Sequence, residues 1–332
     1  MFCSLGIKSY MSSISHTEDK KQSLRVRLKS ITYEAQDVFL FELTPLDGST
    51  LPTFSAGSHL DVQLPNGLTR QYSLCNSPLE NNRYVLGVKK DLFSRGGSNF
   101  MHDELKVGNE LKISLPRNHF PLAPESPHSI LIGGGIGITP LISMAHELNS
   151  KNASWQLFAS FRSRSDVVLV EQLNANRVHL HIDDESSGGF LDIPSVLDAA
   201  PAGSHFYCCG PEPMLNRFLE LSKSIDPNRI HYESFKPVLA KISGDSFDVK
   251  LIKTQKTFSI GPDQTILQVL LKHGISAPGS CEQGICGTCE TRVIDGIPDH
   301  RDSLLSEEER SSNQIMLICC SRSLSPSITL DL

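Results

Sequence analysis

Four cysteines in the last third of the chain constrain its fold more than any other feature. Three of them lie in the run SCEQGICGTCE, where four residues separate Cys281 from Cys286 and two separate Cys286 from Cys289. Cys319 follows thirty positions after Cys289. This C-x4-C-x2-C run with a distant fourth cysteine is the spacing of plant-type [2Fe–2S] proteins, in which soft thiolates hold the iron–sulfide core. We therefore predict a [2Fe–2S] cluster bound by Cys281, Cys286, Cys289 and Cys319.

Two other interpretations of these cysteines are a loop of free thiols and a zinc knuckle. Zinc sites usually combine two C-x2-C elements, and this segment contains one. Cys320 competes with Cys319 for the fourth position, but on a strand the two side chains would point to opposite faces, and we expect Cys319 to face the cluster. Gly284 and Gly287 are expected to let the loop wrap around the cluster. The odd total of nine cysteines, without an export signal, also favours metal binding over disulfides.

Length and composition indicate a globular chain of several domains. Its 332 residues exceed the roughly 100–200 residues of one domain, and 39% hydrophobic with 20% charged residues is an ordinary composition. A net charge of −6 without a basic run argues against nucleic-acid binding. Residues 1–23 lack the apolar region of a secretory signal and are expected to form a flexible extension. No apolar stretch reaches the roughly 20 residues that span a bilayer, so we expect a cytoplasmic protein without membrane partners, monomeric by itself.

The chain divides into three blocks and one linker. Residues 24–125 contain short β-like runs separated by Gly, Pro and Asn turns, which predicts an antiparallel β-barrel or sandwich. In residues 126–235, strand-like and helix-like runs alternate, which predicts an α/β domain with a parallel sheet. Residues 236–245 form a predicted linker. Residues 246–332 combine a hairpin, an amphipathic helix ended by Gly274, the cysteine loop and later strands, an α+β pattern.

Two segments of the first block suit a flavin, although each is weak alone. The strand end Arg70-Gln71-Tyr72-Ser73-Leu74 offers Arg for a phosphate, Tyr for an aromatic stack and Ser for a hydrogen bond. A solvated strand face is the alternative. The run Arg95-Gly96-Gly97-Ser98 precedes a helix-like stretch, so its N–H groups could receive a phosphate, and a plain glycine turn is the alternative.

Two segments of the second block suit a nucleotide. The turn GGGIGITP at residues 133–140 follows a strand and opens a helix, and its glycines permit the close approach of a pyrophosphate or a ring. It matches neither the G-x-G-x-x-G fingerprint nor the Walker sequence, so alone it is weak. The run Cys208-Cys209-Gly210-Pro211 lies at the carboxyl end of a strand, where open α/β sheets bind ligands. We assign Cys208 to the core.

The ordered series RQYSL, RGGS, GGGIGITP, CCGPEPM, ESF and CEQGICGTCETRVIDGIPDHRD resembles the phthalate dioxygenase reductase family, which includes vanillate demethylase reductases. The likeness runs from about residue 24 to the C-terminus. It implies a flavin-binding β-barrel domain, an NAD-binding α/β domain and a C-terminal β-grasp ferredoxin domain in one electron-transfer chain. It also implies FMN in preference to FAD and NADH in preference to NADPH.

The resemblance also implies roles for individual residues. Cys209, Thr139 and Phe235 become the candidate catalytic residues, with Phe235 shielding the isoalloxazine face. Arg162 and Arg164 are expected at the adenosine end or in a solvated loop; an Arg pair could accept the 2′-phosphate of NADPH, which Asp166 makes less favourable. The residues predicted to bind the two cofactors are Arg70, Tyr72, Ser73, Leu74, Lys89, Gly96, Gly97, Ser98, Gly134, Gly137, Ile138, Thr139, Arg162, Arg164, Cys209, Gly210, Pro211, Ser234 and Phe235.

The expected activity follows from what the three groups can carry. A nicotinamide gives up two electrons as a hydride, a [2Fe–2S] cluster accepts one electron at a time, and a flavin handles both. We therefore expect hydride transfer from NADH to flavin and single-electron transfer through the cluster to a separate Rieske-type oxygenase. Two alternatives are a stand-alone flavin enzyme, such as a ferric or nitric-oxide reductase, and a redox sensor without rapid turnover.

Overall fold

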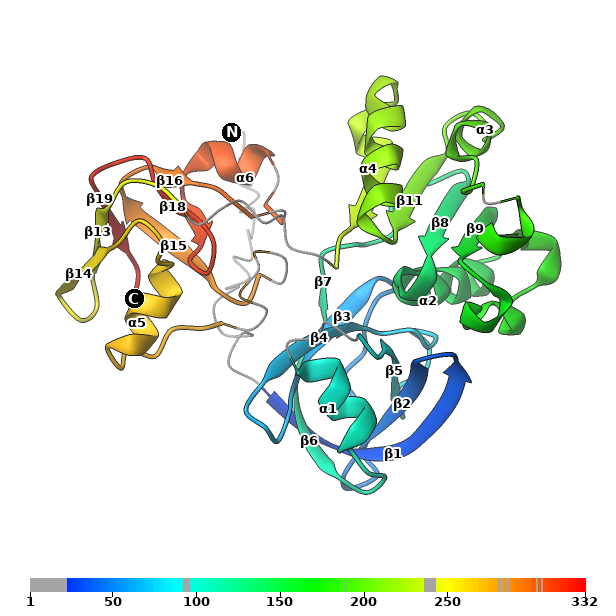
Figure 1. Ribbon diagram of the computed structural model, residues 1–332, viewed down its shortest axis with the longest axis horizontal. Helices are drawn as coiled ribbons and strands as arrows, with labels where there is room; N and C mark the ends of the chain where they lie inside the picture. Colours follow the sequence, from blue (N-terminus) through cyan, green and yellow to red (C-terminus); the bar gives the residue numbers. More distant parts are fainter. Residues whose placement is uncertain are drawn as a thin grey trace, which may run out of the picture.

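The chain folds into three separate units, each with its own β-sheet and core (Figure 1). The computed structural model describes residues 23–91, 96–187, 189–235, 243–279, 282, 284, 287–302, 304–305 and 307–332. The predicted extension at 1–23 therefore lies outside the described residues except for Ser23, and so does most of the predicted linker. Within the described part, no helix combines the length and the apolar character needed to cross a membrane.

The first unit is a curled antiparallel sheet, as the short strand-like runs predicted. The strands follow the order β4-β3-β6-β1-β2-β5, and the two end strands approach each other at a bridge between Leu74 and Leu86. Alternate residues such as Val26 and Leu28 point into a closed apolar core. Its elements are β1 Ser23–Ala35, β2 Val38–Pro45, β3 Ser58–Gln63, β4 Thr69–Ser73, β5 Tyr84–Lys89, α1 Gly97–Asp103, β6 Glu110–Ser114 and β7 Arg117–Asn118.

The second unit is a parallel five-stranded sheet in the order β10-β9-β8-β11-β12, with α2 and α4 packed against it. The central strands β8 and β11 are buried on both faces, and therefore read as continuous apolar runs in the sequence. Its main elements are β8 Ser129–Gly134, α2 Ile138–Ser150, β9 Trp155–Phe161, β10 Val178–Ile182, α3 Ile193–Asp198, β11 His205–Cys209, α4 Glu212–Leu221 and β12 Ile230–Glu233.

The third unit has a mixed sheet in the order β14-β13-β19-β15-β17, in which β13 and β19 are parallel. Helix α5 packs its apolar side onto this sheet; it begins after Thr265, whose side chain forms a capping box with Gln268. Gly274 follows its end with a φ of 71°. The elements are β13 Phe247–Leu251, β14 Lys256–Ile260, α5 Ile266–Lys272, β15 Glu290–Asp295, β16 Pro298–Asp299, α6 Glu307–Ser312, β17 Ile315–Leu317, β18 Arg322–Ser323 and β19 Ser327–Leu330.

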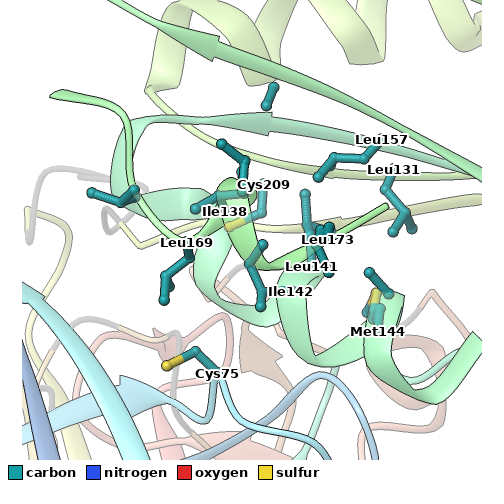
Figure 2. Packing of buried hydrophobic residues seen from close by; sticks show 14 of the residues in the cluster. Cys75, Leu131, Ile138, Leu141, Ile142, Met144, Leu157, Leu169, Leu173 and Cys209 are labelled. Carbon is teal, nitrogen blue, oxygen red and sulfur yellow. The ribbon is translucent and has the colours of Figure 1, made fainter. Parts of the chain in front are cut away.

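An apolar cluster joins the barrel to the parallel-sheet domain. Cys75 and Val85 from the barrel belong to the same buried cluster as Leu141 and Ile142 on α2 (Figure 2). Several polar contacts also lie across this boundary. Among them, the Ser143 hydroxyl donates to the Asn76 carbonyl at 3.0 Å, and Glu147 accepts from the Ala56 N–H at 2.9 Å. In addition to their own cores, the two domains are therefore joined by a buried apolar interface.

Candidate functional site

Three strands from two domains end at one polar site. Ser73 ends β4, Cys209 ends β11 and Glu233 ends β12; Cys209 and Glu233 are direct partners in the parallel ladder. Burial raises the pKa of Glu233 to about 8, and a hydrogen bond from Ser73 lowers it in part. Burial therefore favours the protonated form of this carboxyl beside the end of the RQYSL strand.

Both Cys209 and Thr139, two candidate catalytic residues, are buried. Cys209 lies in the core of the parallel-sheet domain, and Thr139 lies against the barrel, where a Cβ at Gly87 would be 2.8 Å from its Cγ2. Cys209 is fully buried beside Ile138 at the start of α2 (Figure 2). Burial first, and then Glu233 and Cys208, hold the pKa of the Cys209 thiol well above its usual value, so the thiol is neutral. Thr139 is 2% exposed, and its hydroxyl donates to the Ile136 carbonyl at 2.9 Å. Their catalytic role stays a prediction.

The glycine-rich turn after β8 packs tightly against the turn after β11. A Cβ at Gly137 would lie 2.6 Å from the Cys209 carbonyl oxygen, and one at Gly134 would lie 2.6 Å from the Pro211 ring. Gly210 faces Gly134 across the same contact. Glycine is required here because the two turns approach closer than any side chain allows. The structure thus brings together the two segments that the sequence proposed for a nucleotide.

The predicted phosphate-binding residues also lie together. A Cβ at Gly97, the first residue of α1, would lie 2.4 Å from the Arg70 side chain, and Gly96 has a φ of 88°. Ser98 Oγ accepts from the Asp91 N–H at 3.2 Å. Nearby in the sequence, Gln71 Nε2 and Asn99 Oδ1 are buried without a hydrogen-bond partner among the described atoms. Buried polar atoms of this kind suit a polar ligand such as a flavin.

One arginine and one carboxylate in the loop after β9 already have partners of opposite charge. Arg164 makes a two-point contact with Glu185, at 2.7 and 2.9 Å, and Lys89 lies 3.8 Å from Asp166. Arg162 is exposed. The structure therefore does not bring Lys89 to the Arg70 cluster, and it holds Arg164 in an ion pair. Ser234 is partly buried and Phe235 is 39% exposed at the end of the domain.

The predicted cluster ligands are described only in part. Cys281 and Cys286 lie outside the described residues, whereas Cys289 and Cys319 are 1% and 3% exposed. The Ile318 N–H donates to the Cys289 carbonyl, which places the last two predicted ligands in neighbouring segments. The expectation that Cys319 and Cys320 alternate on a strand was wrong, because β17 ends at Leu317 and a turn follows. The choice of Cys319 stays a prediction.

Cys320 and Asp302 lie against the cysteine loop. A Cβ at Gly284 would lie 2.6 Å from Cys320 Sγ and 3.0 Å from Asp302 Cα, and Gly284 has a φ of 69°. The Asp302 carboxylate accepts from the Leu305 N–H at 2.8 Å, and Arg310 donates to the Asp302 carbonyl at 2.7 Å. This buried support fixes the chain that faces the loop.

The loop also touches the barrel. Thr288, one residue before Cys289, accepts a hydrogen bond from Arg117 at 3.3 Å and donates one to Asp61 at 3.2 Å. Arg117 and Asp61 are themselves paired at 2.8 Å. A Cβ at Gly287 would lie 3.2 Å from His119 Nε2.

Comparison with known proteins now identifies the family. A family model for a 2Fe-2S iron-sulfur cluster binding domain matches residues 249–324. The phenoxybenzoate dioxygenase subunit beta of Ectopseudomonas oleovorans is 44% identical over 309 residues, covering 92% of this chain and 97% of that protein. The solved phthalate dioxygenase reductase, described as a modular structure for electron transfer from pyridine nucleotides to [2Fe-2S], is 36% identical with a TM-score of 0.71, covering 93% and 98%. The chain belongs to the phthalate dioxygenase reductase family.

Membership in the phthalate dioxygenase reductase family confirms the expected fold class, with an antiparallel barrel-like domain, a parallel-sheet domain and a C-terminal iron–sulfur domain. It also confirms that the chain is an oxidoreductase. A further relative, the tetrachlorobenzoquinone reductase of Sphingobium chlorophenolicum, is 43% identical over 318 residues, covering 93% of this chain and 98% of that protein.

Sequence reasoning missed several residues at the junction of the three domains. Glu233 lies within the ESF segment but was assigned no role, although a carboxylate at the end of a strand is itself a signal of a functional site. His59, Asp61, Arg117 and Thr288 gave no local signal, because the contacts that join them link positions far apart in the chain.

Proposed function

We propose that this chain is the reductase component of a two-component Rieske-type oxygenase system. In this proposal electrons pass from NADH through FMN to a [2Fe–2S] cluster and then to the oxygenase. The observation that carries it is the position of the cysteine loop: Asp61, which contacts Thr288 of that loop, is the cross-strand partner of Gln71 in the RQYSL strand. The segment predicted to hold a cluster is thus one strand away from the segment predicted to hold a flavin.

The described residues fit a flavin and a nicotinamide nucleotide. Bound flavin would supply the conversion of a hydride into single electrons. Arg70 would neutralise its phosphate, Tyr72 would pack on the ring system and Ser73 would place its hydroxyl beside the ring. The turn that carries Gly134 and Gly137 packs closely on the turn at Cys209–Pro211, and these two turns would border the nucleotide site. Burial raises the pKa of Glu233 beside Ser73, so this carboxyl could take part in proton transfer near the flavin.

NADH is preferred over NADPH because the candidate phosphate-binding arginine is already engaged. Arg164 contacts both carboxylate oxygens of Glu185. A 2′-phosphate would have to compete with this two-point contact, and it would also meet the nearby Asp166.

Anaerobic titration of the purified protein with NADH tests the proposal. We expect the flavin absorption to bleach and a rhombic EPR signal of a reduced [2Fe–2S] cluster to appear, with NADPH much less effective. Bleaching without the cluster signal, in protein shown to contain iron and sulfide, would contradict it. Reduction of a Rieske oxygenase, followed by its own EPR signal, tests the partner.

A second candidate acceptor is a small quinone. The relative named tetrachlorobenzoquinone reductase matches nearly the whole chain, so direct reduction of a small acceptor is a specific alternative. Rapid steady-state NADH oxidation with a benzoquinone, unchanged by any Rieske protein, would favour this function over the first.

A further inference from the structure

We propose that Thr288, Asp61 and Arg117 form a latch that fixes the cysteine loop on the flavin barrel and thereby positions the cluster for electron transfer within the chain. The inference rests on the proposed function, because the latch matters for activity only if electrons pass from flavin to cluster. We use the name Thr288 latch for these three residues. They act through the position of the loop and are not catalytic residues.

The contacts of the Thr288 latch form a closed triangle. Arg117 Nη2 donates to Asp61 Oδ1 at 2.8 Å and to Thr288 Oγ1 at 3.3 Å, and Thr288 Oγ1 donates to Asp61 Oδ2 at 3.2 Å. Asp61 and Arg117 both belong to the barrel, on β3 and β7, so they stay paired with or without the loop. The hydroxyl of Thr288 is the part supplied by the iron–sulfur domain, and it uses both its donor and an acceptor position.

The burial of the latch residues strengthens these hydrogen bonds. The Asp61 side chain is 8% exposed and that of Arg117 is 22% exposed, so water competes poorly for either group. Beside them, His119 packs against Gly287 and stacks on His59, with ring centroids 5.3 Å apart. Burial first, and then Arg117 and His119, lower the pKa of His59 well below its usual value, so the His59 ring is neutral at neutral pH.

The latch lies directly behind the predicted flavin site. In the antiparallel pair of β3 and β4, Asp61 is opposite Gln71 and His59 is opposite Ser73. A hydroxyl one residue from the predicted ligand Cys289 is therefore fixed to the strand that carries the predicted flavin contacts. By contrast, nothing in the latch touches the glycine turns of the nucleotide site within the described residues.

The electron balance shows which step the latch should control. Each NADH delivers two electrons with its hydride and leaves as NAD⁺. The electrons then move singly to the cluster and on to two one-electron acceptors, while the remaining proton is released. Hydride delivery does not involve the loop, whereas both single-electron steps into the cluster do. Loosening the latch should therefore slow the second stage alone.

Thr288→Val tests this with Thr288→Ser as its matched control. Valine keeps the shape but removes both hydrogen bonds and leaves the Asp61–Arg117 pair intact, whereas serine keeps the hydroxyl. In stopped-flow experiments on the holoprotein we expect unchanged flavin reduction by NADH. Electron transfer to the cluster should be about tenfold slower in Thr288→Val and close to normal in Thr288→Ser. Equal cluster reduction in Thr288→Val and wild type would overturn the proposal.

Two controls distinguish an effect of the latch on the position of the cysteine loop from an effect on the reduction potential of the cluster. The cluster potential is measured in each variant, because residue 288 neighbours Cys289; a potential shift large enough to explain the slower transfer would overturn the positioning role. Arg117→Gln then loosens the latch from the barrel side. Because both changes act on one contact, the Arg117→Gln/Thr288→Val double variant should be no slower than the slower single variant, and additive effects would contradict a single latch.

A structural measurement that does not depend on electron transfer tests the latch independently of the proposed function. Small-angle scattering of the holoprotein should show a larger radius of gyration in Thr288→Val than in wild type or Thr288→Ser. If wild-type protein failed to reduce its cluster with NADH, the proposed function would be wrong, and the scattering would still decide whether the latch holds the loop. An unchanged scattering profile would overturn the latch.

Discussion

The barrel meets its two neighbouring domains through surfaces of opposite character. Toward the parallel-sheet domain it shares a buried apolar cluster that includes Cys75, Val85 and Ile142, with a few hydrogen bonds embedded in it. Toward the iron–sulfur domain, the described contacts centre on the hydroxyl of Thr288 and the paired side chains of Asp61 and Arg117. Apolar burial gives strength, whereas a small polar contact can be made and broken at low cost.

This difference matches the two kinds of transfer proposed for the protein. A hydride moves between groups in direct contact, so the barrel and the nucleotide domain need one fixed arrangement. Single electrons need the cluster close to the flavin and later accessible to an outside acceptor. A domain held by a polar latch can serve both needs, and a domain buried in a shared core cannot.

The largest effect on the free energy of unfolding is expected at Gly57, a glycine in the apolar surface between the barrel and the parallel-sheet domain. Gly57 has a φ of 88°, and a Cβ there would lie 2.0 Å from the Phe120 carbonyl oxygen and 3.1 Å from Met144 on α2. Gly57→Ala should lower the free energy of unfolding by about 3 kcal/mol or more, since backbone strain and overlap add. Gly67→Ala is the matched control, with a φ of 83° and no atom within 4 Å, and should cost about 1 kcal/mol. Urea denaturation followed by circular dichroism measures both; equal losses would show that the contact with Phe120 is not rigid.

The next effect concerns Glu233, which lies where the two surfaces meet. Its pKa is raised to about 8 in the folded protein, mainly by burial, whereas in the unfolded chain the carboxyl ionises near its usual 4.5. Between these values the unfolded state releases a proton that the folded state keeps. Stability should therefore be fully present below about pH 4.5 and be lost as the pH rises towards 8, with on the order of 2 kcal/mol of the loss between pH 6.5 and 8.

Glu233→Gln should remove this pH dependence, and the exposed Glu212→Gln is the control. His59 lies 3.8 Å from Glu233, and its lowered pKa changes stability in the opposite direction below about pH 6.5. Urea midpoints between pH 6.5 and 8.5 therefore isolate Glu233. A wild-type stability that stays flat over this range, parallel to that of Glu233→Gln, would show that the carboxyl is already ionised.

The sequence predicted the fold class and several strand ends and turns, because these depend on short-range patterns. The β8 turn and the CCGP turn were both visible as strand ends that contain glycine, and the end of α5 was marked by Gly274. The prediction that Cys319 and Cys320 lie on a strand was wrong, because an apolar run does not reveal that its strand ends at Leu317.

What the sequence could not provide were contacts between distant segments. Asp61 and Thr288 are 227 positions apart, and neither stands out from its neighbours. Arg164 is another example: the sequence allowed it to bind a phosphate, but in the structure its side chain contacts Glu185. Pairing of charged side chains depends on tertiary structure, so residue type alone left these roles open.

The smallest effect should come from a hydrogen bond within the apolar surface, and it gives the sharpest contrast with the Thr288 latch. Ser143 on α2 is fully buried and donates to the Asn76 carbonyl at 3.0 Å. Ser143→Ala leaves that carbonyl without this donor and should cost about 1 kcal/mol in the free energy of unfolding, against less than about 0.5 kcal/mol for the exposed control Ser49→Ala. Because the surrounding cluster still holds the two domains together, electron transfer from flavin to cluster should keep its wild-type rate in stopped-flow measurements. A slowed transfer in Ser143→Ala at full stability would mean that the apolar surface, too, controls the position of the cluster, and the division of labour between the two surfaces would fail.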